Sequence, residues 1–212
     1  MQGKKRLWGR RINRENEVIM KVVAFNGSAR KDGNTAILVR LVLSTLEKEG
    51  IRTELLQLAG EQVQGCNACY RCMKEQNRRC AVEDDIVNEC IGRMDEAEGI
   101  ILASPTYFAD VSPAMKALMD RAGFVAMANE GMFRRKVGAA VVAVRRGGAI
   151  HAFDTMNHFF FISEMVVPGS NYWNVGIGLD RGDVEKDVEG MRTMRVLGEN
   201  MAWVMKRLYG ET

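Results

Sequence analysis

Apolar and polar residues recur along the chain with two different periods. Short apolar or β-branched runs at residues 18–25, 99–103 and 137–144 predict strands. Residues 51–58 alternate between polar and apolar side chains, as a strand at the margin of a sheet does, and a short strand is expected near Val166. The pattern therefore predicts five strands.

The segments between these strands have helical character. The predicted helices cover residues 35–49, 85–97, 112–122 and 150–165, and a long helix ends the chain. Asn34 stands where the first helix needs an N-cap, and Gly50 lies just past its end. Ser112 and Pro113 fit the cap and the first position of a later helix.

The last helix is predicted to bury one face. Its apolar residues recur at intervals of mostly three and four, a spacing that places them on one side of a helix. They are Val184, Val188, Met191, Met194, Leu197, Met201, Val204 and Leu208.

The alternation of strands and helices predicts the fold. Strands that alternate with helices run parallel through right-handed crossovers, which gives a three-layer, doubly wound α/β domain. For five strands we expect the flavodoxin-like order 2-1-3-4-5. In that order, ligands bind at the carboxyl ends of strands 1 and 3.

Composition and charge narrow the class of protein. Hydrophobic residues make up 47% of the 212 residues and charged residues 27%, as is usual for a globular protein. The net charge of +3 comes from residues 1–20, since the other 192 residues hold 24 Lys/Arg against 25 Asp/Glu. The domain after residue 20 is therefore not expected to carry the excess of positive charge with which proteins bind nucleic acid or a membrane.

Residues 1–19 are interpreted as a basic tail before a domain at residues 20–212. The tail has no apolar run long enough for a signal sequence, and no later stretch approaches the length of a membrane span. We therefore expect a cytoplasmic protein.

The loop after the first strand is suited to a phosphate. Residues 26–35 (NGSARKDGNT) supply hydroxyls, a guanidinium, an amide and glycine backbone directly before a helix N-terminus. The loop lacks the lysine of a Walker motif and the glycine spacing of a dinucleotide-binding turn, so a phosphate monoester fits best. The alternative is an ordinary connection capped by Asn34.

The loop after the third strand is suited to a flat ring. Residues 104–108 (SPTYF) place a rigid proline beside aromatic residues and free backbone groups. A ring in this loop and a phosphate in the other indicate FMN.

The two loops GSARKDGNT and SPTYF resemble those of the NAD(P)H-dependent FMN reductase family. The resemblance covers nearly the whole chain after Met20. It implies that the first loop binds the FMN phosphate through Ser28, Arg30, Asn34 and Thr35. It implies that the second loop holds the isoalloxazine through Pro105, Thr106, Tyr107 and Phe108.

Residues after the fourth strand occupy a further position at which such proteins approach the flavin. Arg146 and Gly147 are the candidates there, and adjacent Arg145 and Arg146 would favour an anionic reduced ring. The alternative is an exposed strand end with solvated arginines.

Four of the five cysteines follow the pattern C-x2-C-x2-C-x7-C within residues 65–80. Thiolates at this spacing can surround a compact 4Fe-4S cluster, so Cys66, Cys69, Cys72 and Cys80 are the candidate ligands. Zinc and free redox-active thiols remain alternatives, and disulfides are disfavoured in a cytoplasmic protein. Cys90 is expected to be buried outside the site.

Cysteines after strand 2 combined with FMN loops resemble the iron-sulfur flavoprotein branch of the family. The resemblance implies a homo-oligomer, a dimer or a tetramer, with FMN at a subunit interface. Strand 2 neighbours strand 1, so we expect the cysteine stretch beside the FMN pocket. The resemblance also implies a cluster that can serve the flavin of a neighbouring chain.

The cysteine stretch is also basic, which suggests a partner. It carries Arg71, Lys74, Arg78 and Arg79 against Glu75. Positive charge would steer an acidic, ferredoxin-like electron carrier toward the cluster. The alternative is a solvated loop.

The sequence thus predicts an FMN and 4Fe-4S electron-transfer flavoprotein that acts as an oxidoreductase, with no side chain serving as acid or base. One alternative is a cluster-free NAD(P)H-dependent FMN or quinone reductase. The other is a non-catalytic flavoprotein whose cysteines sense oxidants. NAD(P)H is a candidate electron donor.

Overall fold

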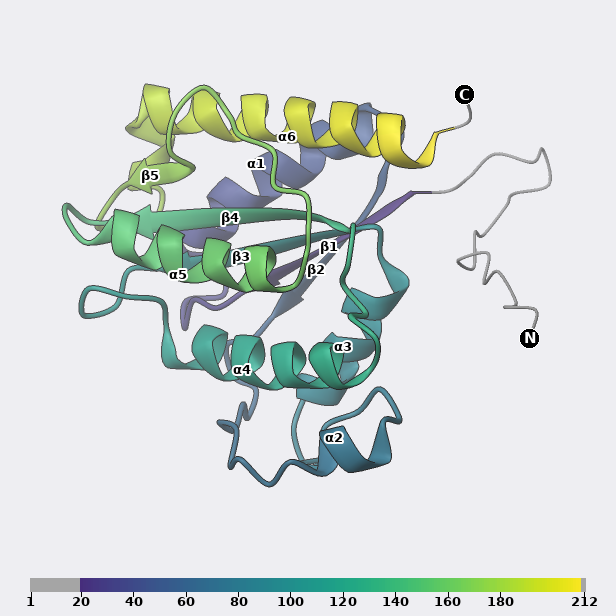
Figure 1. The fold of residues 1–212 in the computed structure, drawn as a ribbon. Coiled ribbons are helices and arrows are strands. Elements are labelled where there is room, and N and C mark those ends of the chain that lie inside the picture. Colours follow the sequence, from purple (N-terminus) through teal and green to yellow (C-terminus); the bar gives the residue numbers. More distant parts are fainter. Residues whose placement is uncertain (1–19, 211–212) are drawn as a thin grey trace.

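Parallel strands form the middle layer of the structure, a computed structural model that describes residues 20–210 (Figure 1). The strands are β1 (Lys21–Asn26), β2 (Arg52–Gln57), β3 (Gly99–Pro105), β4 (Val137–Val144) and β5 (Val175–Ile177). Their order is β2-β1-β3-β4-β5, which confirms the predicted flavodoxin-like topology. The predicted tail at residues 1–19 and the first two positions of the predicted first strand lie outside the described residues.

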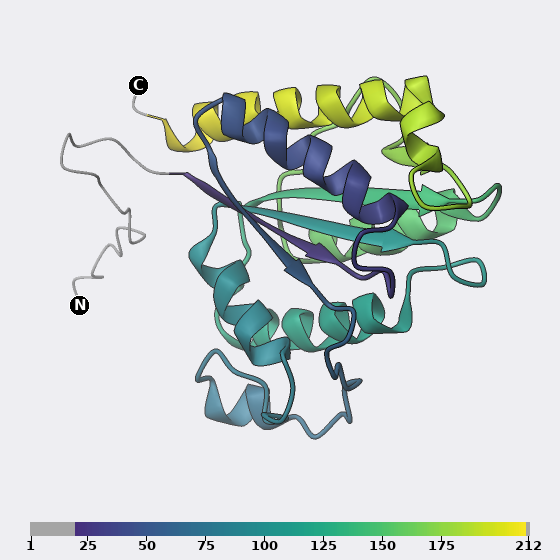
Figure 2. The same ribbon diagram turned by 180° about the vertical axis from the view of Figure 1, so that it is seen from behind.

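Helices cover both faces of this sheet. α1 (Asn34–Lys48) and α6 (Val188–Tyr209) lie side by side on one face, as the view from behind shows (Figure 2). α3 (Val87–Glu96), α4 (Pro113–Ala128) and α5 (Ala149–Ile162) cover the other face. β1, β3 and β4 lie between two apolar cores and are therefore almost continuously apolar.

The fifth strand is not where the sequence pattern placed it. Val166 forms only an isolated parallel bridge to Val137, at the start of β4. The chain then leaves the sheet at Pro168, which has no backbone N–H to continue the ladder, and returns beside the end of β4 as β5. The edge strand is thus split, and the prediction identified only its first piece.

Two helices differ more from their predicted bounds than the others do. α4 continues to Ala128, six residues beyond the predicted end, and Gly123 lies inside the helix. α6 begins at Val188, after a short 3₁₀ helix (Asp183–Lys186) that contains the buried Val184. Val188 and Leu208, predicted to be buried, are exposed at the two ends of α6.

The helix signals of α4 and α1 are partly confirmed. Ser112 caps α4, since its hydroxyl accepts a hydrogen bond from the N–H of Met115 at 3.2 Å, and Pro113 is the first helical residue. Gly50 follows α1 in a left-handed conformation. The cap of α1, however, is Gly33, and Asn34 is the first residue inside the helix.

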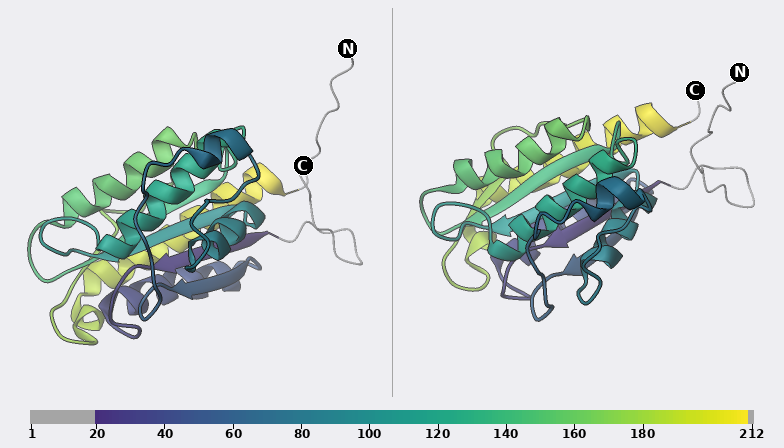
Figure 3. Two further views of the ribbon diagram at one scale, coloured as in Figure 1. Left: turned by 90° about the horizontal axis from the view of Figure 1, so that it is seen from below. Right: turned by 60° about the horizontal axis from the view of Figure 1, so that its bottom comes forward.

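The cysteine stretch lies outside the layer of α3 and α4. Viewed from below, residues 65–80 and the short helix α2 (Arg71–Glu75) cross over these two helices (Figure 3). The sequence did not predict α2. Within residues 20–210, no helix has both the length and the apolar character needed to cross a membrane.

Candidate functional site

Loops from three neighbouring strands meet at the carboxyl edge of the sheet. The N–H of Gly27 donates to the carbonyl of Ala103 at 2.8 Å, which joins the loop after β1 to strand β3. The N–H of Thr106 donates to the carbonyl of Ala143 at 2.9 Å, which joins the loop after β3 to β4. The residues predicted to bind FMN therefore lie along one edge.

The loop after β1 is held from within and from β2. The N–H of buried Ser28 donates to the Asn26 side chain at 3.0 Å, and its hydroxyl accepts from the N–H of Arg30 at 3.1 Å. The side chain of Gln57, at the end of β2, donates to the Ser28 carbonyl at 2.8 Å. Sequence reasoning did not identify Gln57, which follows an alternating strand pattern without a motif of its own.

The first turn of α1 presents N–H groups to this loop. Gly33 at the N-cap has no side chain that could accept hydrogen bonds from them. Thr35 is buried in the same turn. Asn34 is also buried, and its side-chain oxygen accepts a hydrogen bond from the N–H of Gly182 at 2.9 Å. The amide group of Asn34 thus braces the loop after β5.

The loop after β3 contains a buried hydroxyl that lacks a partner. Among residues 20–210, Oγ1 of Thr106 is inaccessible to solvent and has no hydrogen-bonding partner. Leaving such a group unpaired costs about 1–3 kcal/mol. Next to it, Phe108 has a left-handed backbone (φ 42°) and a fully exposed ring, and Tyr107 bridges to Asp110 through its backbone. These features are typical of a loop shaped for a ligand.

The loop after β4 packs against the loop after β3. Gly148 has a φ of 88°, and a Cβ atom there would lie 3.1 Å from Cγ2 of Thr106, so this position requires glycine. Arg146 and Gly147 are exposed immediately before it, and Pro105 is half-buried.

Two side chains of this edge also contact groups distant in sequence. Arg30 donates to the carbonyl of Leu179, after β5, at 3.3 Å. His151, at the start of α5, lies 3.5 Å from the carboxylate of Asp110.

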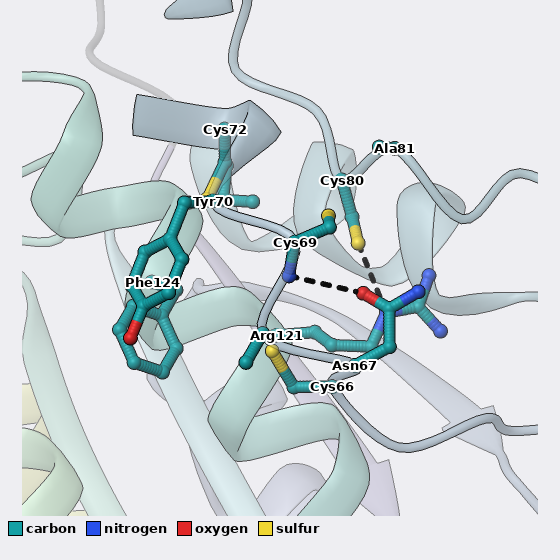
Figure 4. A pocket seen from close by; sticks show the side chains of 11 residues that line it. Cys66, Asn67, Cys69, Tyr70, Cys72, Cys80, Ala81, Arg121 and Phe124 are labelled. Carbon is teal, nitrogen blue, oxygen red and sulfur yellow. Dashed lines mark hydrogen bonds between the residues drawn. The ribbon is translucent and has the colours of Figure 1, made fainter. Parts of the chain in front are cut away.

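The four predicted cysteine ligands line one cavity that is partly open to solvent (Figure 4). The other lining residues are Asn67, Ala68, Tyr70, Ala81, Arg121, Phe124 and Val125. None of the residues predicted to bind FMN is among them. The cavity lies on the outer side of α4, with the sheet on its inner side, so the expectation that it opens beside the FMN loops is not met within one chain.

Backbone and aromatic contacts shape this cavity. Ala68 and Tyr70, on either side of Cys69, both have a left-handed φ of 53°. The Tyr70 ring packs edge-on against Phe124 of α4, with 6.3 Å between the ring centroids. Among residues 20–210, however, no three His, Cys, Asp or Glu side chains come close enough together to hold a single metal ion.

Arg121 is a charged lining residue that sequence reasoning missed. It lies in the middle of α4 with its side chain fully buried, and it forms an ion pair with buried Asp85. Burial by itself would raise the pKa of Asp85, but hydrogen bonds from Arg121 and from two backbone N–H groups outweigh it and keep that pKa below its ordinary value. The helical period was a usable signal, since Arg121 follows the apolar Leu118 by three positions and precedes Val125 by four.

Cys90 is separate from the cavity, as predicted. It is buried on α3, and this burial raises the pKa of its thiol to about 12. Burial also raises the pKa of the Cys72 thiol, which is half-buried.

Comparison with known proteins assigns the family. The NADPH-dependent FMN reductase family matches residues 20–180. An iron-sulfur flavoprotein of Methanocaldococcus jannaschii is 40% identical over 194 residues, which cover 88% of this chain and 98% of that protein. The chain belongs to the NADPH-dependent FMN reductase family, in its iron-sulfur flavoprotein branch.

Other members and neighbours agree with this assignment. An iron-sulfur flavoprotein of Methanosarcina thermophila is 30% identical over 189 residues, 88% of this chain and 96% of that protein. A flavodoxin from the domain Archaea has the same fold, with a TM-score of 0.57 at 15% identity over 88% of this chain and 99% of its own. The chain is therefore a flavodoxin-like member of an FMN-binding oxidoreductase family.

Proposed function

We propose that this family member is an electron-transfer flavoprotein with FMN at the carboxyl edge of the sheet and one 4Fe-4S cluster in the cysteine cavity. The observation that carries the proposal is that Cys66, Cys69, Cys72 and Cys80 all line one cavity. When bound, FMN would supply one- and two-electron transfer and the cluster would supply one-electron transfer.

The loops at the carboxyl edge would each bind a different part of FMN. The uncapped first turn of α1, with Ser28, Arg30, Asn34 and Thr35, would bind the phosphate. Pro105, Thr106, Tyr107 and Phe108 would border the ring, and the unpaired hydroxyl of Thr106 would gain a partner there. Arg146 and Gly147 would approach the ring from the loop after β4.

The cluster part rests on the donor set. Four thiols are suited to a cubane cluster, in which each thiolate binds a different iron, so the ligands do not converge on one point as they would around zinc. That arrangement is compatible with four thiols that surround a cavity without forming a site for a single ion. Ala68 and Tyr70 have left-handed backbones. Left-handed residues of this kind occur in the concave arrangements of backbone N–H groups that bind anions and many iron-sulfur clusters.

The proposal includes a homo-oligomer. Because no residue predicted to bind FMN lines the cysteine cavity of its own chain, we infer that electrons would pass between the cavity of one chain and the FMN of another. Sedimentation of the FMN-loaded protein tests this part, and a monomer at micromolar concentration would rule it out.

Anaerobic purification tests the cluster. We expect about four iron and four sulfide per chain in addition to FMN, which is the composition of one 4Fe-4S cluster. Cys80→Ser should lower the iron content, whereas Cys90→Ala, a change at the buried cysteine outside the cavity, should not. FMN without iron in the wild-type protein would refute the cluster and favour a cluster-free reductase.

The family match gives specific support to that second candidate, an NAD(P)H-dependent FMN or quinone reductase. Stopped-flow spectroscopy separates the two functions. Rapid reduction of the flavin by NADPH alone would favour the reductase, and reduction only through a protein carrier would favour the electron-transfer flavoprotein.

A further inference from the structure

Arg121 reaches the cysteine loop from a distant part of the chain. Its Nε–H donates a hydrogen bond to Cys80, with 3.2 Å between Nε and Sγ. A dashed line marks this bond in Figure 4. Among the cavity-lining residues in the described range 20–210, Arg121 is the only one with a guanidinium or ammonium group. A fully buried arginine in contact with a thiol is unusual, because burying a charge is costly unless every donor has a partner.

The other donors of Arg121 hold both ends of the cysteine loop. Nη1 donates to the carbonyl of Gln64 at 3.1 Å and pairs with Asp85, and Nη2 donates to the carbonyl of Val82 at 2.8 Å. Gln64 precedes the loop and Val82 follows it. The planar fork of the guanidinium therefore fixes the loop ends and leaves Nε–H directed at the sulfur.

The backbone of Cys80 is fixed as well. The side-chain oxygen of Asn88 accepts from the N–H of Cys80 at 2.8 Å, and its amide nitrogen donates to the Cys80 carbonyl at 3.0 Å. Cys66 and Cys69, in contrast, are exposed. Cys80 is thus the cysteine whose position the rest of the domain determines most closely.

The charge of Arg121 and its hydrogen bond have different effects. Asp85 balances the buried charge, so the Nε–H···S hydrogen bond is the specific influence on the sulfur. Reduction adds an electron to a cysteine-bound cluster and increases the negative charge on its sulfur ligands. A donor directed at one of these sulfurs stabilises the reduced form and raises the reduction potential.

We propose that Arg121 is a positioning residue that sets Cys80 in place as the fourth ligand and raises the reduction potential of the group bound by the four cysteines. This inference rests on the proposed function, because it requires a cysteine-bound redox group. Beyond that function, Arg121 of α4, a residue outside the cysteine motif, would determine the potential at which the site accepts electrons.

Two variants and a control test the inference in the anaerobically purified, FMN-loaded protein. Arg121→Lys keeps the charge beside Asp85 but removes the fork. The double variant Asp85→Asn with Arg121→Gln removes both charges together, so no lone buried carboxylate remains. Lys116→Gln is the control, since it removes an ion-paired but exposed cation from the same helix.

The measurements are iron, sulfide and flavin per chain and the midpoint potential of the cluster in a redox titration. We expect the double variant to lower the equilibrium constant for reduction about tenfold, which is about 59 mV for one electron. Arg121→Lys should give a shift in the same direction, and Lys116→Gln should leave the potential unchanged.

The outcomes separate the inference from the proposed function. Wild-type protein without iron refutes the proposed function before any variant is made. Full iron content and a wild-type potential in both Arg121 variants would refute the inference alone. If the double variant loses its iron, it has no cluster potential to measure. The potential of Arg121→Lys then tests the inference, and a wild-type value in that variant would refute it. Loss of iron from both variants while FMN and the thermal unfolding temperature are retained would support the positioning role.

Discussion

The side-chain oxygen of Asn34 accepts a hydrogen bond from the N–H of Gly182 at 2.9 Å, across 148 positions of the chain. This bond ties the first turn of α1 to the turn after β5. A residue that the resemblance assigns to the FMN phosphate therefore also supports the structure around the phosphate loop, and the two roles require separate tests.

Two substitutions at Asn34 distinguish these roles. Asn34→Asp keeps an acceptor for Gly182 but places a carboxylate at the phosphate loop, so we expect at least about tenfold weaker FMN binding with the apoprotein's stability retained. Asn34→Ala removes the acceptor, and the unfolding free energy should fall by about 1–2 kcal/mol. Fluorescence titration with FMN and thermal unfolding measure the two effects. Wild-type FMN affinity in Asn34→Asp would place this side chain away from the phosphate.

The ion pair of Asp85 with Arg121 predicts a specific acid sensitivity. Because the pKa of Asp85 is lowered in the folded state, its contribution to stability is present above the ordinary aspartate value of about 3.9. That contribution is lost as the pH falls through the lowered pKa. Asp85→Asn should therefore show a smaller fall in unfolding free energy between about pH 5 and pH 2 than the wild type.

The same substitution should also destabilise the protein at neutral pH. It leaves Arg121 buried without its counter-charge, which costs about 3–5 kcal/mol. Urea unfolding followed by circular dichroism measures both effects. Asp154→Asn, which changes an exposed carboxylate of α5, is the control. If both proteins had the same pH profile as the wild type, the buried pair would not be the source of the acid sensitivity.

The aromatic pair of Tyr70 and Phe124 covers part of the cysteine cavity. Phe124→Ala should open this side to oxygen, so the iron content should fall several-fold faster in air. The edge-to-face contact is worth about 1 kcal/mol, so the fold should survive the change. Iron release timed with a chelator measures the effect. Phe161→Ala, at an exposed position on α5, should lose iron at the wild-type rate.

The basic surface of the cysteine loop is smaller than the sequence suggested. Arg71 pairs with Glu75, and Arg78 pairs with Asp95. Within the described part of the chain, Lys74 and Arg79 form no ion pair. These two residues are therefore the ones expected to attract an acidic electron carrier.

Charge reversal tests that docking role. Lys74→Glu with Arg79→Glu should slow reduction by an acidic carrier about tenfold at low salt, and the difference should shrink as ionic strength rises. Stopped-flow kinetics over a series of salt concentrations measures this. Arg78→Gln, at a residue already paired with Asp95, should have a smaller effect. An unchanged salt dependence in the double reversal would exclude docking at this loop.

The sequence was sufficient for the fold because its signals are local. β1, β3 and β4 are buried on both faces, so their apolar runs stand out, and the alternation with helices then predicts a parallel, doubly wound sheet. The fifth strand was misplaced because two short segments share one edge, and only pairing with β4 shows which of them forms the ladder.

The candidate site was predictable only where it consists of a contiguous motif. The four cysteines lie close together in sequence and line the same cavity. The cavity's place on the outer side of α4 depends on contacts between distant segments, for which the loop carries no pattern. Phe124 and Val125 line it from the part of α4 that lay beyond the predicted helix end.

The carbonyls of Gln64 and Val82, which both accept hydrogen bonds from Arg121, bring the two ends of the cysteine loop to one fixed point on the domain. The cysteine loop can therefore be regarded as an insert that is exchangeable between domains, provided that the domain fixes its two ends. Residues 76–79, in the long gap before Cys80, are exposed and lie between these two anchors. Transplanting the insert into another flavodoxin-like domain would require its recipient helix to carry an arginine at the position of Arg121.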